Sequence, residues 1–249
     1  MKIGLLGTAA DRPGHVPPEL AAVVHPDTQL EMYPVTAAIF AHTPVELAMQ
    51  QVNYLEAGLR AARDGCDAIV CVSTADYAVA VLRETLDIPV IGAGEAALTF
   101  GRLLGTRFSI VTVWPGSTNF IHENNVRLHG VAANLASIRN VMEEDILQAD
   151  TRPDAFISRM QSGDPDTFAR IVASCRHAEA EDGAEYLILG CTCMSPIAAD
   201  VARECTRAVV NPFATAVSVA ETMARSRPPG GTGVDLRPET LARLTQMVS

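Results

Sequence analysis

Two segments of the chain, 64–74 and 182–192, follow the same pattern, and this internal repeat constrains the fold more than any other feature. Each begins with an Asp-Gly turn, continues as an apolar run and ends in a small nucleophilic residue followed by Thr. The nucleophilic residue is Ser73 in the first copy and Cys191 in the second, 191 − 73 = 118 positions apart. Because this spacing is a little under half of the 249 residues, we expect two similar lobes that present Ser73 and Cys191 at equivalent strand ends.

Apolar runs alternate with helix-forming segments along the whole chain. The runs at 2–6 and 67–72 predict strands, and the continuous run at 67–72 is typical of a strand that is buried on both faces of a parallel sheet. Thr43 followed by Pro44 predicts the start of a long helix that extends to about Arg63. This alternation is typical of βαβ units. We therefore expect an α/β fold of two pseudo-symmetric, flavodoxin-like lobes with parallel sheets and an active site in the cleft between them.

The expected lobe boundaries follow from the repeat. Lobe 1 comprises residues 1–95 with 212–249, on the Ser73 side, and lobe 2 comprises residues 96–211, on the Cys191 side. Further helices are expected at 76–85, 95–104 and 195–206, and a weaker strand at 135–141. Segments rich in Gly, Pro or acidic residues predict a loop at 7–18, a helical surface excursion at 143–165 and a linker at 226–233.

The acidic charge balance limits the partners. A formal net charge of −10 and a pI near 5.0 argue against nucleic acid, which demands clustered Lys and Arg. The first apolar run is interrupted by Asp11-Arg12-Pro13 before a signal peptide could be complete, and no run approaches the ~20 apolar residues of a membrane helix. We therefore expect a cytoplasmic protein that binds no nucleic acid and no membrane. The oligomeric state stays open, and a homo-oligomer is allowed.

The six cysteines do not form the pattern of a disulfide framework. Four of them lie in apolar surroundings and are expected to be small buried hydrophobes: Cys66, Cys71, Cys175 and Cys205. The Cys191-Thr-Cys193 pair lacks the CxxC spacing of a redox or metal motif, and no His or second Cys pair follows at a zinc-like distance. We therefore expect no metal site, and the role of Cys193 stays open.

The glycines at the fourth predicted strand resemble a dinucleotide fingerprint. Gly92-x-Gly94-x-x-Ala97 follows a strand and opens a helix, as such a fingerprint does. However, the acidic residue expected ~20 positions later is missing, and the pattern does not follow the first strand. Tight packing of the helix on the strand is the favoured explanation, so no nucleotide cofactor is expected.

Cys191 is the strongest candidate for chemistry. A thiol at a strand's carboxyl end, just before a helix that begins near Ser195, lies near free N–H groups that favour the thiolate and bind an anion. Such a thiolate is a competent general base or acid, and the alternative is a buried structural cysteine. The same geometry gives Ser73 and Thr74 hydroxyl and N–H donors, although Ser73 as a simple helix cap is the alternative.

Two such loops on either side of a cleft suit proton transfer at a planar carbanion, whose oxygens neutral donors would hold. No Lys or Arg lies convincingly at these strand ends. Trp114, the only Trp, is either a pocket wall or core filler. Candidate substrate-binding residues lie at expected strand ends, helix starts and neighbouring loops: Thr8, Thr43, Thr74, Trp114, Ser117, Thr192 and Pro212.

Five segments together resemble the cofactor-independent aspartate/glutamate/hydantoin racemase superfamily. They are 67–74, 88–97, 107–112, 123–127 and 189–194. The Gly94-Glu-Ala and Leu189-Gly-Cys pieces are most similar to hydantoin racemases. The resemblance implies two pseudo-symmetric lobes, an active site between them, no cofactor, and inversion of the substrate by two cysteines, one on each face of its α-carbon.

One position departs from the family pattern. Cys191 matches the second catalytic cysteine, but Ser73 stands where the first is expected, and Cys71 lies two residues too early. Arylmalonate decarboxylases, a related branch, also lack the first cysteine. The leading hypothesis is a racemase or epimerase of a small carboxylate or hydantoin-type substrate, with Cys191 as acid/base and Ser73 on the other face. The alternatives are a decarboxylase in which Cys191 donates a proton, and a non-catalytic module that binds a small ligand.

Overall fold

The computed structural model describes residues 1–8, 17–37, 39–144, 157–158, 160–226 and 238–248. Most of the expected loop 7–18 and linker 226–233, and the middle of the segment 143–165, lie outside these residues. The chain forms two compact units, the first of Met1–Ala93 with Ala216–Ser249 and the second of Gly94–Thr215. The chain passes between the units within the helices α3 (Ala93–Gly101) and α9 (Pro212–Arg225).

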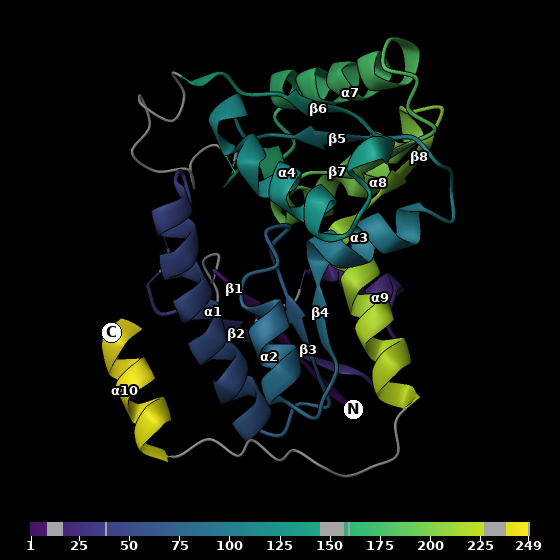
Figure 1. Cartoon of the computed structure of the whole chain (residues 1–249). Helices are drawn as coiled ribbons and strands as arrows, with labels where there is room; N and C mark the ends of the chain where they lie inside the picture. Colours follow the sequence, from purple (N-terminus) through teal and green to yellow (C-terminus); the bar gives the residue numbers. More distant parts are fainter. Residues whose placement is uncertain (9–16, 38, 145–156, 159, 227–237, 249) are drawn as a thin grey trace. The chain divides into compact units, whose positions relative to one another are not determined.

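Each unit contains one four-stranded parallel sheet (Figure 1), which confirms the predicted α/β class. The first sheet has the order β2-β1-β3-β4, with strands β1 (Lys2–Gly7), β2 (Gln29–Pro34), β3 (Ala68–Cys71) and β4 (Val90–Gly92). The second has the order β6-β5-β7-β8, with strands β5 (Phe108–Thr112), β6 (Leu135–Asn140), β7 (Tyr186–Leu189) and β8 (Ala208–Val210). The strand that precedes Ser73 and the strand that precedes Cys191 therefore occupy the same place in their sheets.

The backbone hydrogen bonds of the two sheets repeat with the spacing of the sequence. In the first unit, Asp67 donates its N–H to Lys2 O (2.7 Å) and accepts the Lys2 N–H at Oδ2 (2.7 Å). In the second, Glu185 donates to Arg107 O (2.8 Å) and accepts the Arg107 N–H at Oε2 (3.0 Å). The equivalent carboxylates are 185 − 67 = 118 positions apart. The repeat in the sequence is thus a repeat in strand register.

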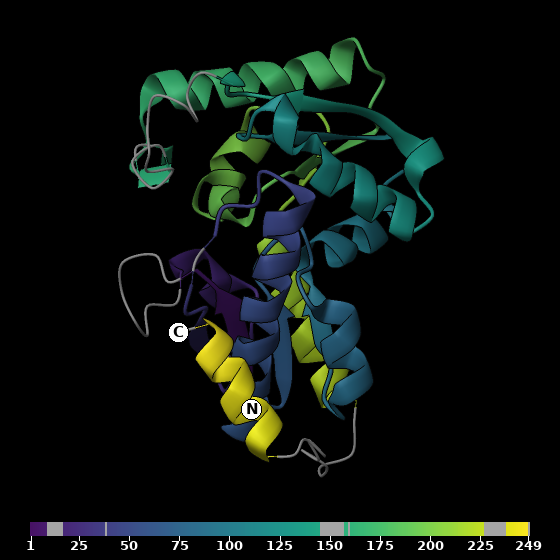
Figure 2. The same cartoon turned by 60° about the vertical axis from the view of Figure 1, so that its left-hand side comes forward.

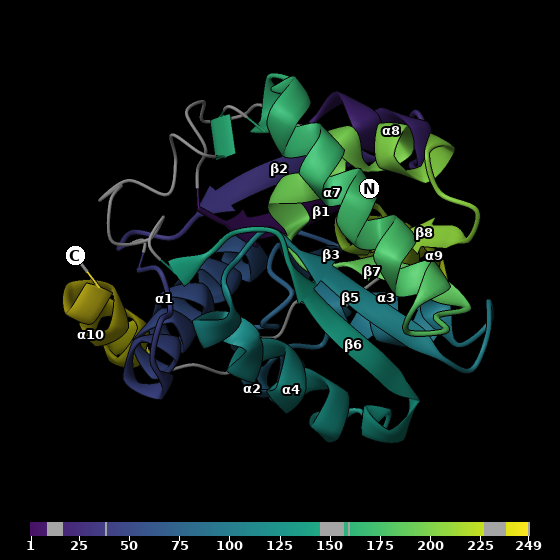
Figure 3. The same ribbon diagram turned by 90° about the horizontal axis from the view of Figure 1, so that it is seen from above.

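The helices cover both sheets. In chain order the remaining ones are α1 (Pro44–Arg63), α2 (Val79–Thr85), α4 (Asn119–Leu128), α7 (Pro165–Ala180), α8 (Ala198–Arg203) and α10 (Pro238–Val248), with short 3-10 helices η1 (Pro18–Ala22), η2 (Gly116–Thr118), η3 (Ala132–Asn134) and η4 (Thr192–Ile197). Within the first unit, α10 packs against α1 (Figure 2). Within the second, α7 crosses the sheet and contacts β5, β6 and β7 (Figure 3). Among the described residues, no helix combines the length and the apolar character needed to cross a membrane.

The alternation of side chains along β7 builds two separate cores in the second unit. Leu187 and Leu189 belong to a core that α7, η4 and α8 complete. Tyr186 and Ile188 point to the opposite face and pack with residues of α3 and α4. All four side chains are buried, as expected for a strand covered on both faces. β7 is thereby fixed on both sides, and so is the position of the residues that follow it.

The Asp-Gly turn before β7 carries an ion-pair cluster. Asp182 accepts two hydrogen bonds from Arg139, from Nε and from Nη2 (both 2.7 Å), and one from the Ser137 hydroxyl (2.5 Å). The hydrogen bonds from Arg139 hold the pKa of Asp182 below its ordinary value. Gly183 follows with φ 69°, and its counterpart Gly65 with φ 76°, a conformation that glycine adopts without strain.

Replacing Asp182 with Asn is expected to lower the free energy of unfolding at neutral pH by about 1–2 kcal/mol, because a bidentate, partly buried partner of Arg139 is lost. Since the folded pKa of Asp182 is lowered, this contribution is present above the unfolded pKa of about 3.9 and disappears as the pH falls through the folded pKa. Urea titrations at several pH values measure this.

Glu181→Gln is the matched control. Glu181 contacts the same guanidinium through one oxygen at 2.8 Å, and its side chain is 60% exposed. Exposed ion pairs contribute little, so this variant should lose less than about 0.5 kcal/mol. Equal losses in the two variants would contradict the structural role given to Asp182.

Candidate active site

Cys191 lies two residues beyond β7, at the start of the 3-10 helix η4. Its backbone is extended (φ −142°, ψ 136°), and its Sγ accepts the N–H of Cys193 at 3.2 Å. The carbonyl of Cys191 accepts the N–H of Met194 at 3.1 Å. The side chain is half-buried and packs on the core beneath β7. A sulfur with an N–H donor directed at it is well placed to carry negative charge.

The prediction of a helix at 195–206 was wrong about where the helix begins and about its type. A 3-10 helix runs through Thr192–Ile197, and the α-helix α8 follows only at Ala198–Arg203. Pro196, inside the 3-10 segment, has no N–H to donate to a regular α-helical ladder. The donor near the Cys191 sulfur is therefore a single local N–H group rather than the N-terminus of a long helix.

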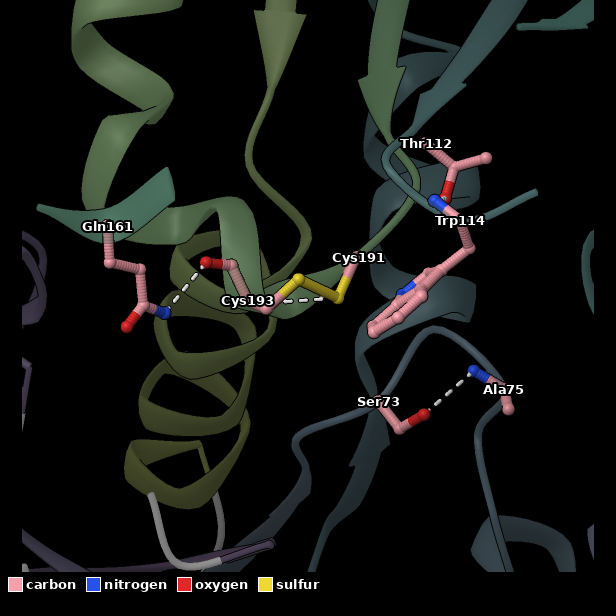
Figure 4. The surroundings of a disulfide bond; sticks show 7 residues. All are labelled: Ser73, Ala75, Thr112, Trp114, Gln161, Cys191 and Cys193. Carbon is pink, nitrogen blue, oxygen red and sulfur yellow. Dashed lines mark hydrogen bonds between the residues drawn. A yellow bond between two sulfur atoms is a disulfide. The ribbon is translucent and has the colours of Figure 1, made fainter. Parts of the chain in front are cut away.

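Cys191 and Cys193 are joined by a disulfide bond (Figure 4). Their Cα atoms are 5.2 Å apart, within the usual range for a disulfide. The pair lacks the CxxC spacing of a redox motif, so the expectation that it is not a redox pair was wrong. The carbonyl of Cys193 accepts a hydrogen bond from Gln161 Nε2 at 3.0 Å. In this oxidised form Cys191 carries no thiol.

The other cysteines behave largely as expected. Cys66, Cys71 and Cys175 are free and buried, whereas Cys205 is half-buried and free. Burial raises the pKa of the Cys71 thiol well above its ordinary value, and the nearby Asp76 carboxylate raises it further. A hydrogen bond with Cys175 lowers the pKa of Cys205. Cys71 is therefore a poor substitute for a catalytic thiol at position 73.

Trp114 follows β5 and packs on the same core as Cys191. Its N–H group on the backbone donates to Thr112 Oγ1 (3.3 Å), and its carbonyl accepts from Asn140 Nδ2 (2.7 Å). In Figure 4 the indole points toward the Cys191 sulfur. The two hydrogen bonds fix the Trp114 backbone, and the half-buried ring extends from it as a wall next to the sulfur would.

Three other expected substrate contacts lie in the second unit, and their burial and hydrogen bonds bear on their roles. Ser117 is exposed, and its N–H and hydroxyl donate to the two carboxylate oxygens of Glu144 (both 2.7 Å). Pro212 is buried as the first residue of α9. Thr192 is half-buried as the first residue of η4. Of this set, only Thr192 directly adjoins Cys191.

Sequence reasoning missed the amide that links the segments after β7 and β8. Asn211 donates from Nδ2 to Ser195 Oγ (2.9 Å), and its Oδ1 accepts the N–H groups of Phe213 (3.1 Å) and Ala214 (3.4 Å). Asn211 therefore caps α9 and ties it to the segment that carries Cys191. An Asn before a Pro signals a helix cap in the sequence. The hydrogen bond to Ser195, 16 positions earlier in the chain, cannot be predicted from that local signal.

Ser73 has the equivalent position in the first unit, two residues beyond β3. Its Oγ accepts the N–H of Ala75 at 3.2 Å (Figure 4), and its side chain hydrogen-bonds to the Tyr77 hydroxyl. Burial raises the pKa of Tyr77 well above its ordinary value, so Tyr77 stays neutral. Ser73 is half-buried and held on two sides.

The loop after Ser73 differs from its expected form. The helix predicted from Asp76 begins only at Val79, because Asp76 (φ 51°) and Ala78 (φ 59°) are in the left-handed region. Non-glycine residues in this conformation are strained and cluster at functional sites. The loop therefore holds Ser73 and Thr74 without a helix N-terminus directly behind them.

The Asp76 carboxylate explains the glycine at the end of β4. A Cβ atom on Gly92 would lie 2.3 Å from Asp76 Oδ1, so any larger residue would displace the carboxylate. Position 92 therefore requires a glycine because of its contact with the neighbouring loop that carries Asp76. Sequence reasoning gave Asp76 no chemical role, yet it places a carboxylate at the carboxyl ends of β3 and β4.

The remaining candidates of the first unit are less enclosed. Thr8 is exposed just after β1. Thr43 is exposed and is the N-cap of α1, where its hydroxyl donates to Glu46 Oε2 (3.0 Å) and accepts the Glu46 N–H (3.3 Å). Thr74 is half-buried beside Ser73. Within the described part of the chain, no group of three or more His, Cys, Asp or Glu residues could hold a metal ion.

Comparisons with known proteins identify one family to which this chain is similar. A family model described as Asp/Glu/Hydantoin racemase matches residues 19–220. A hydantoin racemase from Paenarthrobacter aurescens is 28% identical over 177 residues, which cover 71% of this chain and 70% of that protein. The allantoin racemase from Klebsiella pneumoniae superposes with a TM-score of 0.77 at 22% identity, covering 90% of this chain and 87% of that one. A mutant of arylmalonate decarboxylase gives a TM-score of 0.63 at 17% identity, covering 93% and 97%. At these identities the two solved structures show a shared fold.

Proposed function

We propose that this chain, which belongs to the Asp/Glu/hydantoin racemase family, racemises or epimerises a small amino-acid-like or hydantoin-type substrate without a metal or an organic cofactor. Enzymes of this kind are isomerases that move a proton at the carbon next to a carbonyl. The observation that carries the proposal is the position of Cys191, half-buried at the end of β7 with the Cys193 N–H 3.2 Å from its sulfur.

In its reduced form Cys191 would serve as the principal acid/base. The N–H donor at its sulfur favours the thiolate, which removes the α-proton, and the resulting thiol returns a proton. Thr192, and Thr74 of the first unit, are proposed to bind the carboxylate or the enolate oxygens, because hydroxyl and N–H groups stabilise charge that develops there. Trp114 is proposed as an apolar wall beside the reacting carbon.

Ser73 is proposed to serve the other face of the substrate carbon, directly or through a water molecule. A serine hydroxyl ionises far less readily than a thiol, so it needs help from its surroundings. The hydrogen bonds with Ala75 and Tyr77 support this role by holding the Ser73 side chain in place. Thr8, Thr43, Ser117 and Pro212 remain proposed substrate contacts; the bonds that Thr43 and Ser117 make to carboxylates favour roles in shaping their loops.

A decarboxylase is the second candidate, and Ser73 is the observation that favours it. With a hydroxyl at position 73 and the thiol of Cys71 buried, one face of the proposed substrate lacks a ready proton carrier. In this version carbon dioxide leaves a malonate-type substrate, and Cys191 alone protonates the enediolate that remains.

A direct test is proton NMR of the reduced protein in deuterium oxide with single-enantiomer substituted hydantoins, aspartate, glutamate, and aryl- or alkylmalonates. We expect the α-proton of a hydantoin-type or amino-acid substrate to exchange while optical purity is lost. Loss of a carboxyl group, with one deuterated enantiomer formed, would establish the decarboxylase instead. Exchange without loss of optical purity would show that Ser73 does not serve the second face.

Variants at position 73 separate the two candidates further. In the racemase, Ser73→Gly should reduce racemisation by about a hundredfold or more, because one proton carrier is lost. In the decarboxylase, Ser73→Gly should be tolerated and Ser73→Cys should add racemisation.

The place of action is proposed to be the cytoplasm, with a small-molecule carboxylate or hydantoin as the ligand. A reducing compartment suits the mechanism, because it keeps cysteine thiols reduced. This expectation rests on the need for a free Cys191 thiol.

A further inference from the structure

We propose that Cys193 is a redox partner of Cys191, and that the disulfide between them is a reversible inactive form of the site. The proposal rests on the acid/base role proposed for Cys191. It gives Cys193 a function of its own: it captures the oxidised Cys191 sulfur before that sulfur is damaged further.

The position of the pair favours a switch over a structural crosslink. The disulfide closes a loop with a single residue, Thr192, between its ends. In the chain-entropy model the stabilisation by a disulfide grows with the length of the loop that it closes, so this one contributes among the least. A bond that stabilises the fold so little is better explained by chemistry at the residues it joins.

Access to oxidants separates this pair from the three buried cysteines. Cys191 and Cys193 are half-buried, as is Cys205, whereas Cys66, Cys71 and Cys175 are buried. Oxidation by peroxides follows thiolate character and exposure. Within the pair, the N–H of Cys193 at the Cys191 sulfur favours the thiolate at Cys191, so the Cys191 sulfur reacts before that of Cys193.

The surroundings allow the bond to open and close without moving the sheet. β7 is packed on both faces, and the Cys193 carbonyl is held by Gln161 Nε2 at 3.0 Å. The Met194 N–H also bonds to the Cys191 carbonyl at 3.1 Å. Neither of these two hydrogen bonds involves a cysteine sulfur, so both are available in both redox forms.

The chemistry balances with hydrogen peroxide as oxidant and a dithiol as reductant. The Cys191 thiolate attacks one peroxide oxygen and becomes a sulfenic acid, and the other oxygen leaves as water after protonation. The Cys193 sulfur then attacks the Cys191 sulfur and displaces the hydroxyl group as a second water. In the reverse direction, one thiolate of the dithiol opens the disulfide to a mixed disulfide, and its second thiol releases both cysteines as the dithiol is oxidised.

The test follows the thiols by mass spectrometry, with no need for a substrate. The full-length protein is reduced with dithiothreitol, freed of it, and treated with increasing hydrogen peroxide. We expect the peptide that contains both cysteines to lose two hydrogens, and dithiothreitol to restore an alkylatable Cys191. In Cys193→Ser, excess peroxide should convert Cys191 to sulfinic acid, so that recoverable Cys191 falls at least tenfold below the wild-type value.

Cys205→Ser is the matched control, because Cys205 is half-buried and its partner is Cys175. It should respond as the wild-type protein does. The proposal is overturned if no Cys191–Cys193 link forms on oxidation, or if Cys193→Ser retains as much recoverable Cys191 as the wild type.

Turnover, measured in the same samples, separates this inference from the proposed function. Activity that is lost with the link and returns with dithiothreitol supports both. If the Cys191–Cys193 disulfide forms and opens but the protein turns over none of the substrates, the racemase proposal and the control of its activity are both contradicted. The protection of Cys191 by Cys193 is then still supported. Turnover of a substrate by a protein that forms no Cys191–Cys193 disulfide on oxidation would contradict the redox inference alone.

Discussion

Cys191→Ala, assayed in the reduced protein, is expected to lower kcat/KM for racemisation by about a thousandfold or more. Losing an essential proton carrier costs about this much, which corresponds to roughly 4 kcal/mol of transition-state stabilisation. Because Cys191 is only half-buried at a strand end, the variant should fold as the wild type does. The measurement is loss of optical activity under single-turnover and steady-state conditions, with circular dichroism as the check on folding.

Cys205→Ala provides the comparison, since it removes a half-buried free thiol of the same unit that lies outside the proposed site. It should stay within about threefold of the wild-type kcat/KM. If Cys191→Ala kept a tenth or more of the activity, Cys191 would not be the acid/base, and another residue would have to move the proton.

Gly190→Ala is expected to have the largest effect on stability, a loss of about 3 kcal/mol in the free energy of unfolding. A Cβ atom at this position would lie 2.5 Å from Thr112 Cβ and 3.0 Å from both Thr112 Cα and Ile110 Cγ2. The Gly190 N–H is also bonded to Val111 O at 2.7 Å, so the backbone cannot retreat without breaking the ladder. Overpacking of this kind typically costs 1–3 kcal/mol, and backbone contacts place it at the upper end.

Urea denaturation and thermal unfolding measure this loss, with an expected fall in Tm of roughly 2–4 °C per kcal/mol for a chain of this size. Gly116→Ala is the matched control in the same unit, because the nearest atom to its Cβ would be Glu144 Oε1 at 3.7 Å, an ordinary contact. It should change the stability by less than about 0.5 kcal/mol. A Gly190→Ala protein as stable as the control would contradict the close packing of β7 on β5.

The elements predicted best from the sequence were those fixed by local patterns. The apolar run at 67–72 became β3, buried along its whole length, and Thr43-Pro44 began α1 as predicted. The expected strand at 135–141 also formed, as β6. Its six residues are all half-buried at the edge of the sheet, which explains why its apolar pattern was weak.

The errors arose where distant residues decide the local structure. The helix start at Asp76 failed because Asp76 and Ala78 adopt positive φ, where Asp76 packs against Gly92. The hydrogen bond between Ser117 and Glu144 joins residues 27 positions apart, so the local sequence around neither residue predicts it. The Cys191–Cys193 disulfide was missed for a different reason, since spacing rules describe known motifs and not the geometry of one 3-10 turn.

The prediction of an isomerase of the racemase type came from the resemblance, and the family match confirms it. The residues alone predicted a thiol at a strand end and a hydroxyl at the equivalent position. They did not identify the substrate, because the substrate depends on which loop side chains surround it. The site residues therefore stay predictions that the variants above test.

The shared strand register has a consequence for how such a chain can diversify. The 118-residue offset that relates Asp67 to Glu185 also relates Ser73 to Cys191, so both positions are mounted on the same framework. In the proposed mechanism, a single codon change at either position alters the chemistry of one half, while the sheet that carries it keeps its register. On that mechanism, the duplicated architecture lets evolution, or a protein engineer, move between two-sided and one-sided proton transfer one residue at a time, without a new fold.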